Sequence, residues 1–175
     1  MVAGFHFTPE GKFSFYYSYG AVDREATGTY VLENGIVHLL SDKPAGKDFR
    51  VVQKKSGSHY RIQVLNEPTH MDAAIVARYT ANGDTLQAVS DGKGLILLPE
   101  NDCGNIWLQH RFFPDILSLI KAESDTERDF QVAMSPDFYA VSFKGIELRV
   151  EADTLHCPAN YVMPIEDLRF VKRKK

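Results

Sequence analysis

The sequence contains little cysteine and no long apolar run. Cys103 and Cys157 are too few for a disulfide framework and have no zinc-ligand spacing, so we expect two separate thiols. No segment approaches the roughly 18 apolar residues of a membrane helix, and residues 1–7 lack the basic and apolar regions of a signal peptide. The chain as it stands is expected to be cytoplasmic, or exported if a signal peptide was removed, without membrane association.

The chain also lacks a strong charge of one sign. Its formal net charge is −3, so no general positive field would attract nucleic acid. The one basic run, residues 172–175, is better explained as a solvated chain end than as a phosphate-binding tail. Nucleic acid is therefore not an expected partner.

What the sequence does contain is strand periodicity. The 175 residues are 44% hydrophobic, enough for a sizeable core. In residues 12–19, aromatic side chains occupy alternate positions, which is typical of a strand with one buried face. Asn34-Gly35 tolerates the positive φ of a tight hairpin between residues 27–32 and 36–40. Similar alternation elsewhere, including residues 49–53, 59–65 and 138–143, predicts an all-β fold.

The middle of the chain resembles a known module. It contains an Asn82-Gly83 turn, the step Ser90-Asp91-Gly92-Lys93-Gly94, a run ending at Leu98-Pro99, and Ile106-Trp107-Leu108. This order resembles the small β-sandwich of transthyretin-like or carboxypeptidase-regulatory-like modules. The resemblance implies that Asp91 and Gly94 are scaffold residues and that no catalysis takes place there.

The first segment resembles a second family. The sequences Tyr19-Gly20-Ala21-Val22-Asp23 and Gly28-Thr29-Tyr30 are similar to those of lipocalin-like bacterial proteins of uncharacterised role. The resemblance implies a lipocalin-like barrel or sandwich formed by the N- and C-terminal strands, residues 1–65 and 122–175. A transthyretin-like β-sandwich, residues 66–121, would be inserted between them.

The densest polar and aromatic group is Tyr17, Tyr19, Asp23 and Arg24. If these residues form a ligand site at the barrel mouth, the tyrosines would stack on a ring of the ligand and Arg24 would bind its carboxylate or phosphate. In the structural alternative, which we favour, Asp23 satisfies loop amides, Arg24 pairs with Asp23 or Glu25, and the tyrosines pack in the core.

Metal and catalytic sites are weakly indicated. His70 with Asp72 would share a strand face, whereas adjacent residues such as His156 and Cys157 point to opposite faces. Two ligands do not make a metal site, and the sequence contains none of the common nucleophile, phosphate-loop or zinc-protease motifs. We therefore assign no catalytic residue, metal or cofactor.

Three aromatic residues in the middle of the chain allow two interpretations. Trp107, Phe112 and Phe113 would suit a carbohydrate-binding platform, but a tryptophan in an alternating strand is more often part of a core.

The leading hypothesis is a non-enzymatic binding or interaction module for a small molecule or a protein. Exposed strand edges would also support a homodimer. The alternatives are an enzyme that uses His70 and Asp72 with a metal or a pair of carboxylates, and a structural accessory domain of a larger assembly.

Overall fold

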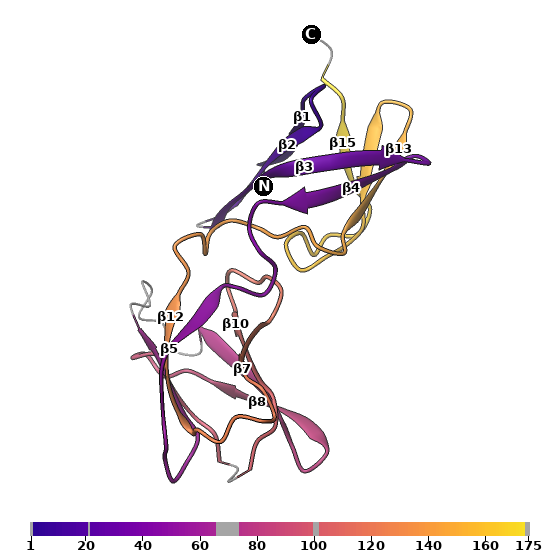
Figure 1. Ribbon diagram of the computed structural model, residues 1–175. Helices are drawn as coiled ribbons and strands as arrows, with labels where there is room; N and C mark the ends of the chain where they lie inside the picture. Colours follow the sequence, from indigo (N-terminus) through magenta and orange to yellow (C-terminus); the bar gives the residue numbers. More distant parts are fainter. Residues whose placement is uncertain (1, 21, 66–73, 100–101, 174–175) are drawn as a thin grey trace. The chain divides into compact units, whose positions relative to one another are not determined.

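The computed structural model describes residues 2–20, 22–65, 74–99 and 102–173 (Figure 1). Within these ranges every regular element is a β-strand, which confirms the predicted all-β class. In the same part of the chain, nothing forms a helix with the length and hydrophobicity that crossing a membrane requires. The chain divides into two compact units: unit 1 comprises Met1–Ala45 and Tyr139–Lys175, and unit 2 comprises Gly46–Phe138.

Unit 1 is one seven-stranded sheet in which every neighbouring pair is antiparallel. In spatial order its strands are β1 (Val2–Phe7), β2 (Lys12–Tyr19), β3 (Val22–Glu33), β4 (Ile36–Ser41), β13 (Glu147–Glu151), β14 (Thr154–Cys157) and β15 (Leu168–Val171).

The local sequence explains the first strands of this sheet. Phe13, Phe15 and Tyr17 of β2 are buried, while the residues between them are exposed, as the alternation predicts. Asn34 and Gly35, which join β3 to β4, have φ of 51° and 77°, as a type I′ hairpin requires.

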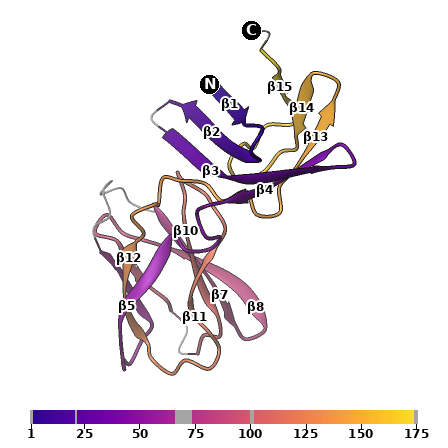
Figure 2. The same cartoon turned by 45° about the horizontal axis from the view of Figure 1, so that its top comes forward.

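The sheet curls until its two outer strands approach each other, and it is nearly closed (Figure 2). Phe5 of β1 and Phe170 of β15 meet edge to face, with ring centroids 5.0 Å apart. The ring centroid of Phe143 lies 5.5 Å from that of Phe5 and 4.9 Å from that of Phe15, so aromatic rings fill the interior. The expectation that the strands of Phe15 and Phe170 share one sheet is confirmed.

Unit 2 contains two four-stranded sheets. The first has the order β11 (Ser118–Lys121), β10 (Ile106–His110), β7 (Ile75–Ala81), β8 (Asp84–Val89). The second has the order β5 (Phe49–Lys55), β12 (Asp129–Met134), β6 (Arg61–Leu65), β9 (Leu95–Leu97). Both contribute to one core, in which Ile62, Ile106 and Phe130 are fully buried.

The observed division differs from the expected domain boundaries. We placed residues 49–65 and 129–134 with the chain ends, but β5, β6 and β12 form one sheet of unit 2. β12 lies between β5 and β6 and pairs in parallel with β6. Alternation identifies which face of a strand is buried and not which strand lies beside it, so the sequence pattern did not reveal this pairing.

A buried lysine stabilises the loops of unit 2. Lys121 is only 1% exposed, and its Nζ donates hydrogen bonds to the carbonyl oxygens of Cys103, Gly104 and Ala122 at 2.8, 2.8 and 3.1 Å. The Tyr60 ring lies 5.7 Å from the same nitrogen. The ammonium group is thus compensated by carbonyl dipoles and an aromatic face.

Candidate functional site

The four residues singled out in the sequence do not share one environment. Tyr17 and Arg24 are paired across β2 and β3 and are both buried, whereas Tyr19 is 62% exposed and Asp23 lies on the opposite, exposed face. Burial raises the pKa of the Tyr17 hydroxyl, and Tyr19 adds to the effect. The structure brings Tyr17 and Arg24 together and separates them from Asp23.

Arg24 contacts main-chain carbonyl groups of the second segment of unit 1. Its Nε donates to the oxygen of Tyr139 and its Nη2 to that of Ala140, both at 3.1 Å. Lys43 donates to the same Ala140 oxygen at 2.7 Å. Residues 138–143, expected to be a strand, instead form a turn and one isolated bridge, between Glu25 and Ala140. Arg24 therefore helps to hold this segment in place.

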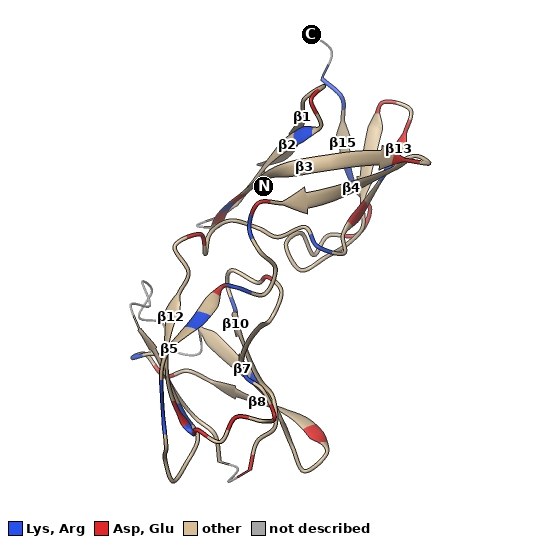
Figure 3. Cartoon of the chain, viewed as in Figure 1, with Lys and Arg blue, Asp and Glu red and all other residues tan. Residues whose placement is uncertain are grey.

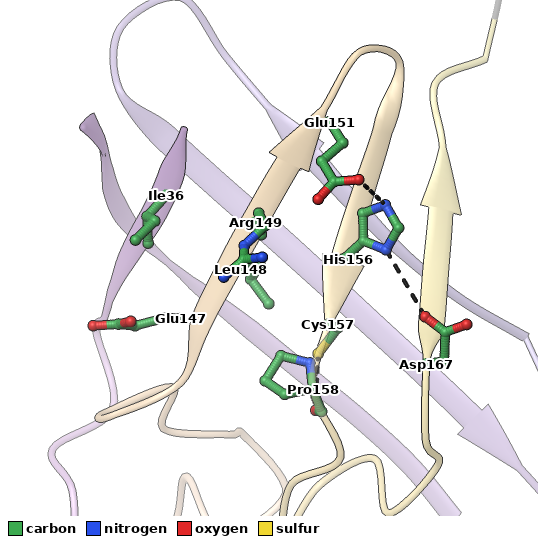
Figure 4. Close-up of a pocket in the computed structure, with 9 residues that line it drawn as sticks. All are labelled: Ile36, Glu147, Leu148, Arg149, Glu151, His156, Cys157, Pro158 and Asp167. Atoms are coloured by element: carbon green, nitrogen blue, oxygen red, sulfur yellow. Dashed lines mark hydrogen bonds and ion pairs between the residues drawn. The ribbon is translucent and has the colours of Figure 1, made fainter. Parts of the chain in front are cut away.

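A surface groove of about 380 Å³ lies over β13, β14 and the start of β15 (Figure 4). Charged positions of both signs occur in this part of unit 1 (Figure 3). The groove is lined by Ile36, Glu147, Leu148, Arg149, Glu151, His156, Cys157, Pro158 and Asp167.

Strand register places His156 at the centre of this charged surface. His156 is paired with Arg149 of β13 on one side and with Arg169 of β15 on the other. Its Nε2 lies 3.6 Å from a carboxylate oxygen of Glu151 and its Nδ1 lies 3.9 Å from one of Asp167 (Figure 4). The imidazole ring thus lies between two carboxylates, and its cross-strand neighbours are two arginines.

Asp167 is held by Arg169. The Arg169 Nε donates to the Asp167 carboxylate at 3.2 Å, and Nη2 donates to its other oxygen. These hydrogen bonds, with smaller electrostatic contributions from Arg169 and His156, lower the pKa of Asp167. Asp167 therefore stays ionised at neutral pH.

Arg149 differs from its neighbours because its guanidinium group makes no hydrogen bond or ion pair with the residues that the structure describes. Glu147 and Glu151 flank it two positions away on the same face of β13. A carboxylate oxygen of Glu147 lies 4.0 Å from His38 Nδ1, and one of Glu151 lies 3.6 Å from His156 Nε2. The groove consequently presents one cationic group between two anionic groups.

Cys157 contacts the groove but is not a reactive thiol. It is buried, and burial raises its pKa to about 11, although the Asn160 amide donates to its sulfur at 3.3 Å. His156 and Cys157 point to opposite faces, as predicted from their adjacency. No disulfide joins Cys157 to Cys103, which confirms two separate thiols.

The proposed metal pair, His70 and Asp72, lies outside the described residues. Among the residues that are described, no three His, Cys, Asp or Glu side chains are placed to hold a metal ion.

The three aromatic residues considered as a platform lie in different environments: Trp107 is half-buried on the face of β10 opposite the core, Phe112 is exposed, and Phe113 is part of the core packing. Phe113 packs against the core, with its ring 5.2 Å from His110 and 5.6 Å from Phe138. His110 is fully buried, and its Nδ1 accepts hydrogen bonds from the backbone N–H groups of Phe112 and Phe113, both at 3.2 Å. Phe113 and His110 thus belong to the packing of this unit.

The sequence alternates Ile146, Leu148 and Val150 with Glu147, Arg149 and Glu151, which indicates a strand with one charged face. Nothing in it connects this face with Asp167 or Arg169. The alternation of charge along β13 was a visible signal, but the register of three strands is needed to assemble the groove.

Comparison of the chain with protein-family models, with curated protein sequences and with solved structures gave no match. The likenesses to lipocalin-like and transthyretin-like proteins stay predictions.

Proposed function

We propose that this protein is a non-enzymatic binding module and that the groove over β13 and β14 is its binding surface. The observation that carries the proposal is the free Arg149 guanidinium group between Glu147 and Glu151. An accessible guanidinium group can bind a carboxylate through two parallel hydrogen bonds.

The spacing of these charges supports an extended peptide segment as the partner. Side chains two residues apart on one face of a strand are separated by about 7 Å. An extended partner repeats this spacing, so a basic-acidic-basic pattern at alternate positions would match Glu147, Arg149 and Glu151 in turn.

The lining of the groove does not favour thiol chemistry. The thiol that lines it belongs to Cys157 and is protonated at neutral pH, because burial raises its pKa to about 11.

Binding at this surface should be weak and sensitive to salt. Each exposed ion pair contributes about 0–1 kcal/mol and is screened by ions in solution. A partner that uses the groove alone would exchange rapidly.

The test is titration of ¹⁵N-labelled protein with acetyl-Lys-Thr-Glu-Thr-Lys-amide. We expect chemical-shift changes at Glu147–Glu151 and His156 that disappear in Arg149→Gln and persist in Arg50→Gln, an exposed arginine of unit 2. The charge-reversed peptide, acetyl-Glu-Thr-Lys-Thr-Glu-amide, should leave these signals in place. Equal responses to the two peptides, or an undiminished response in Arg149→Gln, would contradict the proposal.

A further inference from the structure

The curled sheet of unit 1 has an odd number of strands and two open edges. β1 and β15 are its outer strands, and they lie side by side in both views (Figures 1 and 2). Because all six pairings between neighbours are antiparallel, β1 and β15 run in the same direction. Within the described chain, the backbone ladders end at these two strands.

Direct closure would not suit this sheet. It would pair β1 with β15 in parallel, which is the less stable arrangement, in a sheet that is otherwise antiparallel. One further strand, antiparallel to both edges, would give eight strands and continue the antiparallel ladder around the sheet.

The residues at this seam are covered less well than the rest of the interior. Phe13, Phe15 and Phe143 are buried, whereas Phe5 and Phe170, which meet across the seam, are only partly buried. Aromatic surface therefore remains available along the seam.

We propose that the seam between β1 and β15 accepts one extended β-strand from a partner protein, running antiparallel to both. Edge strands present unpaired N–H and C=O groups that a partner strand can use, and pockets for alternate side chains then give specificity. This site borders the groove at β15, but it uses the edges of the sheet and does not depend on the function proposed for the groove.

The chemistry of the seam specifies the partner strand. Its inward residues would be apolar, to cover Phe5 and Phe170. Its outward residues would be acidic, because the exposed Lys172 and Arg173 directly follow β15. Apolar and acidic residues should therefore alternate.

A second copy of this chain fits the seam less well. β1 has the sequence VAGFHF and β15 the sequence LRFV, so neither edge strand contains a carboxylate to match the basic side chains. A partner of different sequence is the better match in charge.

The test uses the full chain and acetyl-Glu-Val-Glu-Val-Thr-Val-Glu-amide. We expect one peptide to bind per chain and to slow amide hydrogen exchange in both β1 and β15, with no such effect from acetyl-Lys-Val-Lys-Val-Thr-Val-Lys-amide. The double variant Lys172→Gln/Arg173→Gln should bind about fivefold more weakly. The matched control, Lys47→Gln/Arg50→Gln, replaces exposed cations of unit 2 and should bind as the parent does.

Other outcomes would overturn the proposal. These are unchanged exchange in β1 and β15, protection of one edge alone, equal binding of both peptides, and a dimer that forms without peptide and protects the edges. The variant Arg149→Gln should leave binding of this peptide unchanged, so failure of the groove and failure of the seam can be told apart.

Discussion

The two units enclose their hydrophobic cores in different ways. Unit 1 curls a single sheet around aromatic side chains, and its edges meet through Phe5 and Phe170. Unit 2 forms two four-stranded sheets around one core, and the loop at Cys103 and Gly104 is bound by the buried Lys121. Contacts between aromatic rings therefore join the edges of the sheet in unit 1. In unit 2, hydrogen bonds from the Lys121 ammonium group to carbonyl oxygens fix a loop.

The largest expected effect tests the aromatic interior of unit 1. Phe143→Ala should lower the free energy of unfolding of unit 1 by about 5 kcal/mol, because it leaves a cavity and removes ring contacts with Phe5, Phe13 and Phe15. Denaturant unfolding followed by residue-resolved hydrogen exchange would measure the loss in each unit.

The matched variant is Phe130→Ala in unit 2. Phe130 is equally buried but packs in the mixed core of that unit, so we expect a loss of about 3–4 kcal/mol. A larger loss in Phe130→Ala than in Phe143→Ala would contradict the expectation that ring packing contributes more to the core of unit 1 than to that of unit 2.

The second prediction removes the buried charge of unit 2. Lys121→Met keeps the apolar stem but removes the ammonium donor. The Cys103 and Ala122 oxygens still accept from the Tyr60 hydroxyl and the Asp125 N–H, whereas the partly buried Gly104 carbonyl loses its side-chain donor, so unit 2 should be destabilised by about 3 kcal/mol. Thermal unfolding would report the loss. Lys93→Met, at an exposed turn, should change stability by less than about 0.5 kcal/mol. Stability unchanged in Lys121→Met would mean that water replaces the ammonium group.

The sequence predicted local features better than long-range ones. The hairpin at Asn34-Gly35 follows from two adjacent residues whose φ values only certain side chains tolerate. The hydrogen bonds from Arg24 reach carbonyl groups 115 and 116 residues away, and no local pattern encodes such a distance.

The same limit applies to the candidate site. Arg149 and His156 face each other because of strand register, and Asp167 approaches them from outside a strand. Alternation in the sequence assigns each side chain to a face but does not place neighbouring strands beside one another. The set of residues that lines the groove therefore follows from the structure and not from the sequence pattern.

The third prediction compares one glycine in each unit. A Cβ at Gly28 would lie 2.0 Å from the backbone oxygen of Leu40, whereas one at Gly104 would lie 2.4 Å from the Thr80 side chain. The Thr80 hydroxyl can rotate away at the cost of the hydrogen bond that it accepts from the Asn105 N–H, whereas the β4 backbone cannot move without disturbing the ladder. Gly28→Ala should therefore cost about 3 kcal/mol and Gly104→Ala about 1 kcal/mol.

Urea unfolding of the two glycine variants would measure this difference. Gly57→Ala is the control, since its Cβ would meet no atom closer than 3.4 Å. Equal losses in Gly28→Ala and Gly104→Ala would show that the β3–β4 ladder relaxes as readily as a side chain does.

The smallest expected effect concerns acid stability, which should involve two carboxylates of different kinds. In unit 2 the Asp91 carboxylate accepts backbone N–H hydrogen bonds from Leu95 and Lys93 at 2.8 and 2.9 Å, and these bonds lower its pKa. In unit 1, hydrogen bonds from Arg169 lower the pKa of Asp167. A lowered pKa in the folded state means that each group stabilises the fold above its unfolded pKa. The contribution is lost as the pH falls from about 4 through the folded value.

Salt should separate these two contributions, since ions screen the exposed Asp167–Arg169 pair but do not compete for the N–H groups that bind Asp91. Part of the loss of stability at low pH depends on Asp167, and it is measured as the difference between the parent and Asp167→Asn. We expect 0.5 M NaCl to reduce this part. The part that depends on Asp91, measured with Asp91→Asn, should be almost unchanged by salt. NMR titration of the carboxyl carbons, with and without salt, measures both pKa values directly. A salt-dependent pKa for Asp91 that matched that of Asp167 would show that charge, and not main-chain hydrogen bonding, stabilises the turn in unit 2.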